Sequence, residues 1–240
     1  MAKPHRIIVG DIAVDVVPKA IKNLHLGVYP PDGQVRVSAP LHFDDEAIRL
    51  AIISRLPWIR RQQRSFARQE RESQREMVSG ESHWVAGRRY LLEVVEGPRP
   101  DVAILNAQTL RLTVRPGSDR DRREAVLERW YRARLRAAIP PLLAKWEPII
   151  GVTANEVRIK KMKTRWGSCT VEVKRIWLNF ELAKKSPACL EYILVHELVH
   201  LLERHHNARF LALMDRFLPQ WEARRAELNR APLAHAEWGY

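Results

Sequence analysis

The chain has 240 residues, of which 46% are hydrophobic and 29% charged, so it is long enough to bury a sizeable core. No stretch approaches the about eighteen uncharged apolar residues of a membrane span, and no apolar signal segment follows the N-terminus. The two cysteines, Cys169 and Cys189, do not make a disulfide framework. These features exclude a disulfide-rich secreted domain and predict a cytoplasmic protein with no membrane partner.

The formal net charge of +13 would attract anions such as nucleic acid or phosphorylated substrates. However, much of the basic charge lies in the stretches 58–76 and 119–136, where acidic residues are interleaved with the arginines. Such interleaving is typical of a solvated helix surface. A nucleic-acid partner is therefore not the favoured interpretation.

The first part of the chain predicts strands over 6–17, 23–29 and 34–39, with a turn at Pro30-Pro31-Asp32-Gly33 that makes a hairpin of the last two. Asp44 is suited to cap a helix that begins at Asp45, and Pro57 is expected to kink or divide that helix.

A loop over 77–87 comes next, followed by strands over 89–95, 102–105 and 110–114. Pro116-Gly117 is the best domain boundary, which gives a β-rich region 1–117 and a second domain 118–240. No internal repeat is evident in the sequence.

The second domain begins with a long amphipathic helix over about 120–146 that Pro140-Pro141 should disturb. Strands over 155–162 and 175–179 follow. Ser186 and Pro187 then fit the start of a helix that is apolar nearly all round and hence buried. One last helix is expected over about 208–229.

The buried helix contains the sequence His196-Glu197-Leu198-Val199-His200. Histidines four residues apart lie on one face of a helix, so both imidazoles can reach the same cation. Burying these polar groups is costly unless something such as a metal ion satisfies them. Glu197, next to the first histidine, is placed to accept a proton from a metal-activated water. The pattern therefore predicts a metal-dependent hydrolase with Glu197 as its general base.

Catalytic zinc sites usually have three protein ligands. His206 lies nearest the face of His196 and His200 if the helix ends around Glu203. It also follows His196 by the ligand spacing of the extended metzincin pattern. However, this chain has Glu203 where that pattern has glycine. We expect His206 as the third ligand, with Glu203, Glu222 or Glu227 as alternatives. Imidazole ligands favour Zn²⁺; Ni²⁺, Co²⁺ and Mn²⁺ are the other candidates.

Three further segments accompany the motif: Arg165-Trp166-Gly167-Ser168-Cys169, Leu178-Asn179 and His206-Asn207-Ala208-Arg209-Phe210. Together they resemble the YgjP-like metal-dependent hydrolases, a branch of the zincin metallopeptidases similar to the SprT-like group. The resemblance is specific over about 155–217 and looser towards the N-terminus. Members of that family usually have serine where this chain has Asn207.

The resemblance implies His196, His200 and His206 as metal ligands and Glu197 as general base. It also implies an α+β fold in which a zincin-like core, with a small β-sheet packed on the active-site helix, follows the β-rich N-terminal region. Arg165 and Trp166 have two interpretations. They could bind a substrate carboxylate, phosphate or base, or Trp166 could belong to the core while Arg165 pairs with a helix carboxylate.

The favoured function is a metallopeptidase that acts on a peptide held along an edge strand near 165–179. The first alternative is a nucleoside triphosphate (UTP) pyrophosphatase with the same metal site, since some members of the resembled family are assigned that activity. No glycine-rich phosphate loop and no carboxylate cluster suited to magnesium support it. The second alternative is a nucleic-acid-associated protein of a repair or restriction system.

Overall fold

The computed structural model describes residues 4–29, 33–68, 75–162 and 165–230 and has a mixed α+β fold, as predicted. The described residues before 72 form one compact unit, and those from 75 to 230 form another. The predicted boundary at 117/118 falls inside the second unit, between a strand and a helix. The division of the chain into the domains 1–117 and 118–240 stays a prediction. None of the helices in the described ranges is long and apolar enough to cross a membrane.

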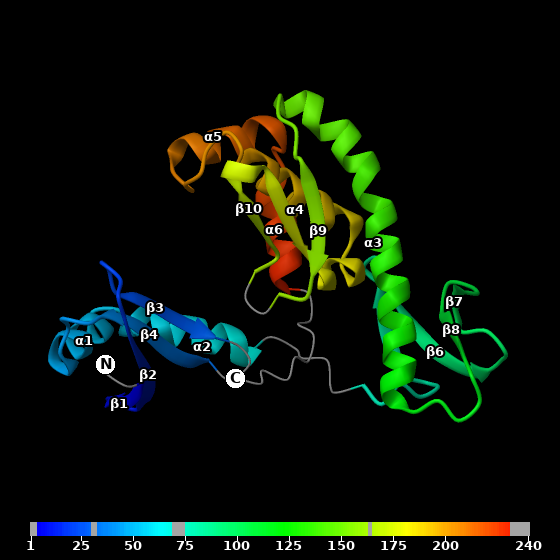
Figure 1. The fold of residues 1–240 in the computed structure, drawn as a ribbon, viewed down its shortest axis with the longest axis horizontal. Coiled ribbons are helices and arrows are strands. Elements are labelled where there is room, and N and C mark those ends of the chain that lie inside the picture. Colours follow the sequence, from blue (N-terminus) through cyan, green and yellow to red (C-terminus); the bar gives the residue numbers. More distant parts are fainter. Residues whose placement is uncertain (1–3, 30–32, 69–74, 163–164, 231–240) are drawn as a thin grey trace. The chain divides into compact units, whose positions relative to one another are not determined.

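The first unit contains a four-stranded sheet and two helices (Figure 1). Its elements are β1 (His5–Val9), β2 (Ile12–Lys19), β3 (His25–Tyr29), β4 (Gln34–Pro40), α1 (Asp45–Ile53) and α2 (Leu56–Arg68). The single strand expected over 6–17 is wrong, because a turn at Gly10, whose φ is +63°, divides it into β1 and β2.

The hairpin of β3 and β4 is confirmed by their antiparallel pairing, while Pro30, Pro31 and Asp32 lie outside the described residues. The cap at Asp44 is also confirmed, since its side chain accepts a hydrogen bond from the Ala47 backbone N–H. The helical pattern is divided before Pro57, which lies in the first turn of α2, where a missing N–H costs little.

The second unit begins with another four-stranded sheet. It consists of β5 (Ser82–Val85), β6 (Arg88–Glu96), β7 (Asp101–Ile104) and β8 (Thr109–Val114), and the helix α3 (Arg120–Ile150) follows. The loop predicted over 77–87 is wrong for its second half, because β5 buries His83 and Val85 on one face while pairing with β6. The alternation is too short to stand out in the sequence.

The two four-stranded sheets have the same topology. The fold therefore contains a repeat that the sequence does not show, and the prediction of no internal repeat is wrong for the structure. Their strand orders are β1-β2-β4-β3 and β5-β6-β8-β7. In each, the first and last pairs are antiparallel and the central pair is parallel. The helix after each sheet is capped by an aspartate, Asp44 or Asp119, through the N–H three residues later.

A three-stranded sheet and the buried helix α4 (Pro187–Val199) form the rest of the second unit, the predicted small sheet on the motif helix. The strands are β9 (Glu156–Lys160), β10 (Gly167–Thr170) and β11 (Arg175–Asn179), in the order β10-β11-β9. Two short 3₁₀ helices, η1 (Val171–Val173) and η2 (Phe180–Lys184), follow β10 and β11. Ser168 and Cys169 of the segment that follows Arg165 lie in β10.

Two predicted helices, over about 120–146 and 208–229, differ in extent from the helices of the structure. The helix α3 continues through Pro140 and Pro141 to Ile150. The last helix is two helices, α5 (Ala208–Phe217) and α6 (Trp221–Arg230). The prediction of one helix is wrong because Pro219 follows Leu218, and the residue before a proline avoids the helical conformation; Leu218 has φ −138° and ψ 71°.

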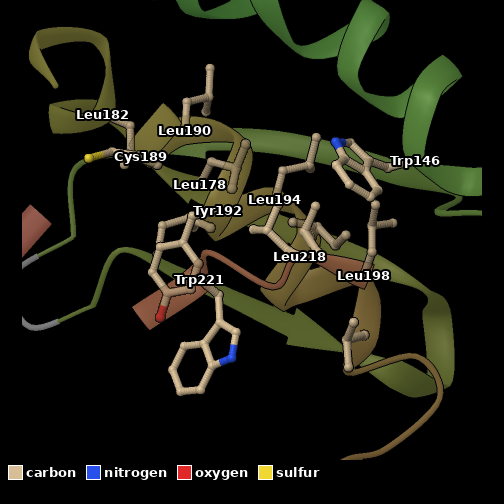
Figure 2. Packing of buried hydrophobic residues seen from close by; sticks show 14 of the residues in the cluster. Trp146, Leu178, Leu182, Cys189, Leu190, Tyr192, Leu194, Leu198, Leu218 and Trp221 are labelled. Carbon is tan, nitrogen blue, oxygen red and sulfur yellow. The ribbon is translucent and has the colours of Figure 1, made fainter. Parts of the chain in front are cut away.

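The helix α4 lies in the middle of the core of this unit (Figure 2). Leu194 and Leu198 are fully buried and pack in one cluster with Trp146 of α3 and Leu178 of β11. Ser186 caps the helix through the Cys189 N–H, as expected. The motif is therefore held on a helix that is packed on all sides, which fixes the direction of its polar side chains.

Candidate metal centre

Three histidine side chains converge where α4 ends. His196 lies in the last turn of α4, His200 is its C-terminal capping residue, and His206 follows in the connection to α5. One nitrogen of each ring belongs to a group in which all three atoms lie within 4.8 Å of one another. Nε2 of His196 is 3.0 Å from Nε2 of His206. The predicted face-sharing of His196 and His200 is confirmed, and the chain brings His206 to the same point.

The chain after α4 turns sharply enough to return His206 to this face. The backbone N–H groups of Leu201, Leu202 and Glu203 bond back to Leu198 and Val199, which closes the end of the helix. Nδ1 of His200 lies 3.1 Å from the Glu203 carbonyl oxygen. A proton on Nδ1 is donated to that carbonyl, which leaves Nε2 of His200 free to bind a cation.

A residue at the start of α5, Phe210, contacts all three histidines. Asn207 caps α5 by accepting a hydrogen bond from the Phe210 N–H at 3.0 Å. Asparagine and serine are both good helix caps, so the departure from the family's usual serine preserves this function. The buried Phe210 ring lies 4.7–4.9 Å from the centroids of all three imidazoles. It restricts the rotamers that the histidines can adopt.

Glu197 is buried beside the histidines, with an exposed fraction of 4%. Its Oε2 atom has no hydrogen-bond partner within the described part of the chain. A Cβ atom on Gly167 of β10 would lie 2.5 Å from Oε1 of Glu197, so only glycine leaves room for this carboxyl group. A buried and unsatisfied carboxyl group is costly, and a neighbouring cation or substrate would relieve that cost.

The pKa values of these groups follow from their burial. Burial and, to a smaller extent, the neighbouring His200 and His206 together lower the pKa of His196 to about 3. Burial raises the pKa of Glu197 to about 8, against the opposing charge of Arg165. Neutral imidazoles are the form that binds metal ions, so this environment prepares the histidines as ligands.

Arg165 and Trp166 lie in the connection between β9 and β10. The Arg165 side chain is exposed, and its charge acts on the helix carboxyl group of Glu197, although no ion pair of Arg165 is formed among the described residues. Trp166 is half-buried and packs against the cluster around α4, with the Lys185 Nζ atom 5.7 Å from its ring centroid. A role in substrate binding stays a prediction for both residues.

Asn179 fastens this connection to the sheet. Its side-chain N–H groups donate to the carbonyl oxygens of Met162 (2.9 Å) and Arg165 (2.8 Å). Its backbone N–H donates to the Trp166 carbonyl oxygen. The residue is buried, with an exposed fraction of 5%. Asn179 therefore fixes the segment that leads into Gly167 and hence the wall against which Glu197 lies.

The sequence did not reveal several residues that shape this site. Gly167, Asn179 and Phe210 were noted only as parts of motif segments, and their contacts with Glu197, the β9–β10 connection and the histidines need the tertiary structure. The carboxylates of Glu203, Glu222 and Glu227, named as alternative ligands, are not members of the three-residue group found among the described residues. The backbone of Glu203, rather than its carboxylate, holds His200.

Comparisons with known proteins give a family and a solved structure to which part of this chain is similar. A family model described as "YgjP-like, metallopeptidase domain" matches residues 22–231. The crystal structure of the metallopeptidase zymogen of Pyrococcus abyssi abylysin is similar at 24% sequence identity and a TM-score of 0.34, and the match covers 39% of this chain and 97% of that chain. No curated protein matches the sequence.

The match over most of the chain defines the class of protein, a metal-dependent hydrolase of the peptidase type. More narrowly, the chain belongs to the YgjP-like family of metallopeptidase domains. The family implies a divalent metal ion, and the histidine group is the place that the described residues offer for it.

Proposed function

We propose that this protein is a zinc-dependent peptidase in which His196, His200 and His206 hold the metal ion and Glu197 is the general base. The observation that carries the proposal is the juxtaposition of three convergent imidazole nitrogens with a buried carboxyl group that lacks a partner. Isolated structural histidines would not need Glu197 beside them. A hydrolytic site needs both.

The donor set fits zinc. Three neutral imidazoles match the ligand type and number of known catalytic zinc sites, in which a fourth position is left for water or substrate. Nε2 of His196 and Nε2 of His206 lie close enough together for both to bind one ion. Zinc bound there would act as a Lewis acid on the scissile carbonyl and lower the pKa of a water molecule to about 7.

Glu197 provides the proton transfer. In its ionised form it accepts a proton from the attacking water and then delivers it to the nitrogen of the leaving group. Burial alone favours the protonated form of Glu197, while a divalent cation held by the adjacent histidines would favour the carboxylate. Gly167 leaves the space that this carboxyl group occupies.

The strand β10 gives a place for the substrate backbone. It lies at the edge of the β10-β11-β9 sheet and, among the described strands, pairs only with β11. An extended peptide can add to such an edge through main-chain hydrogen bonds. Because Gly167 of β10 contacts Glu197, a peptide paired there would lie next to the general base. Arg165, at the entry of this strand, would bind an acidic group of the substrate.

The test combines zinc analysis with cleavage of an unfolded protein such as reduced casein. We expect Glu197→Gln to keep its zinc and to lose activity by about 10²-fold or more, because the general base is removed and the ligands remain. His206→Ala should lose zinc affinity. Glu227→Gln, an exposed carboxylate outside the histidine group, is the matched control and should cleave like the wild-type protein. Wild-type activity in Glu197→Gln would refute this mechanism.

A nucleotide pyrophosphatase is the second candidate, and the exposed Arg165 cation near Glu197 is the observation that favours it. Its guanidinium could bind a phosphate in place of a carboxylate. Release of pyrophosphate from UTP by the zinc-loaded protein, abolished by Glu197→Gln, would establish this activity. The absence of release above the level of that variant would leave the peptidase.

A further inference from the structure

The β10-β11-β9 sheet has a second face that points away from α4. Side chains alternate along a strand, and Val157, Ile159, Ile176 and Leu178 all pack in the cluster around α4. Their neighbours Arg158, Lys160 and Trp177 therefore lie on the opposite, outer face. The metal centre and this outer face are thus separated by the thickness of the sheet.

A pocket opens where β9, the other edge strand of this sheet, meets α3. Its volume is about 530 Å³, within the range of small-ligand sites of about 300–1,000 Å³. Ile139, Pro140 and Leu143 of α3 form an apolar wall, and Arg136, Arg158 and Trp177 add two guanidinium groups and an indole. The pocket therefore combines an aromatic surface with positive charge.

The outer face carries more cations than carboxylates. Glu156 pairs with both Arg158 and Arg175, so one carboxylate serves two guanidinium groups. Arg136 and Lys160 have no carboxylate partner among the described residues. This differs from the interleaved charges expected for the arginine-rich helices. The excess positive charge here is concentrated around one pocket.

Trp177 lies at the centre of this charge. The Arg158 guanidinium carbon is 5.5 Å and the Lys160 Nζ atom 4.5 Å from its ring centroid. Trp177 pairs with Arg158 in the parallel register of β9 and β11, so the contacts follow from the backbone arrangement. The indole is half-buried rather than part of the core. Such interleaving of aromatic rings and cations suits a ligand that has both planar bases and phosphates.

We propose that the outer-face residues Arg158, Lys160 and Trp177, together with Arg136 of α3 at the pocket, bind single-stranded nucleic acid. The cations on β9 and α3 would contact phosphates, and an unstacked base would enter the pocket against Trp177. A duplex presents no free base faces and would leave the pocket unused. An acidic peptide would satisfy the cations but has no group to match the indole and the apolar wall. The site is independent of the proposed metal centre and does not require it to be catalytic.

The experiment measures binding of a fluorescein-labelled oligothymidylate to the full chain by fluorescence anisotropy over a range of salt concentrations. Lys160→Glu should weaken binding about tenfold or more and reduce the salt slope by about one or more, because a phosphate contact becomes a repulsion. Trp177→Ala should weaken binding about fivefold or more with the salt slope unchanged, because stacking is lost and no ion is displaced.

Arg99→Glu is the matched control. Arg99 is exposed in the connection between β6 and β7 and undergoes the same change of charge. It should bind like the wild-type protein. Equal weakening by Arg99→Glu and Lys160→Glu would show that net charge alone attracts the strand and would overturn the proposal. Tighter binding of a duplex or of polyglutamate than of the single strand would also overturn it. Unchanged melting temperatures and zinc content show that the variants are folded, and Lys160→Glu tests the site even if Trp177→Ala is unstable.

Discussion

The two four-stranded sheets share a topology and differ in what they support. In the first unit, the helices α1 and α2 close the core over their own sheet, with Ile48, Ile52 and Ile59 buried in one cluster. In the second unit, α3 begins in the same way. Ile52 and Leu127 are both buried, and each follows its capping aspartate by eight residues (44 to 52 and 119 to 127). However, α3 continues to Ile150 and joins the cluster around α4.

The second sheet is also attached to the start of the motif helix. The N–H groups of Ala86 and Gly87, in the β5–β6 turn, donate to the carbonyl oxygens of Ala183 and Lys184 in η2. Phe180 of η2 packs in the core of the second sheet. The corresponding turn of the first sheet, at Gly10, has open space around it. The same strand arrangement packs with its own helices in the first unit. In the second unit it also holds the segment that leads to the candidate metal centre.

The largest difference between the two units is expected when one buried side chain of each is replaced by alanine. Phe180→Ala should cost about 3–5 kcal/mol of unfolding free energy and also weaken zinc binding, because Phe180 joins the second sheet to the segment before α4. Ile52→Ala should cost about 2–5 kcal/mol in the first unit and leave zinc binding unchanged. Thermal unfolding and zinc titration measure both. Equal zinc affinity in the two variants would contradict the supporting function of the second sheet.

Removal of the metal should separate the two units. A ligand that binds only the folded state at about 1,000 times its Kd adds about 4 kcal/mol to stability. Chelation should therefore lower the melting temperature of the second unit, which contains the histidine group, and leave that of the first unit unchanged. Calorimetry with and without chelator measures this shift. A parallel shift of both transitions would show that the units unfold together.

Alanine at the two turn glycines gives a matched pair of smaller size. Gly10 and Gly87 both have positive φ, +63° and +81°, so either substitution adds strain of about 1–2 kcal/mol. At Gly10 a Cβ atom meets nothing within 4 Å, whereas at Gly87 it lies 3.0 Å from the Cα atom of Ser186. This backbone contact should add about 1–3 kcal/mol of overpacking. Chemical denaturation of the two variants measures the difference, and equal costs would mean that the Ser186 backbone can move.

The sequence predicted the local parts of this structure well. The caps at Asp44 and Ser186 and the strands 34–39, 89–95, 110–114 and 175–179 follow from side-chain chemistry and alternation over enough residues to be visible. The spacing of His196 and His200 also follows from helix geometry alone. These features depend on residues that are close in the sequence.

The parts that failed depend on tertiary contacts. The strands β5 and β10 are short, with four residues each, and their pairing with β6 and β11 defines them. The repeated topology was hidden because only strand pairing reveals it. Likewise, only the tertiary structure shows that the Glu197 side chain lies against Gly167. Each of these features arises from residues that are distant in the sequence.

The smallest expected effect concerns one buried residue that distinguishes the two sheets. His83 of β5 pairs with Tyr90 as Ile7 of β1 pairs with Val14, and both His83 and Ile7 are buried. Burial, helped by the charge of Arg75 and opposed by Glu81, lowers the pKa of His83 to about 4. The folded protein thus keeps His83 neutral, while an unfolded histidine accepts a proton near pH 6.5.

The neutral form of His83 therefore contributes fully to the unfolding free energy above about pH 6.5. This contribution is lost as the pH falls towards 4, by about 1 kcal/mol for each pH unit. His83→Ile, which gives the second sheet the residue of the first, should make the unfolding free energy of the second unit less dependent on pH in this window. The reciprocal Ile7→His should add an acid-sensitive transition to the first unit. Denaturation at pH 7 and pH 5 measures both, and an unchanged slope in His83→Ile would assign the acid sensitivity of this unit to other groups.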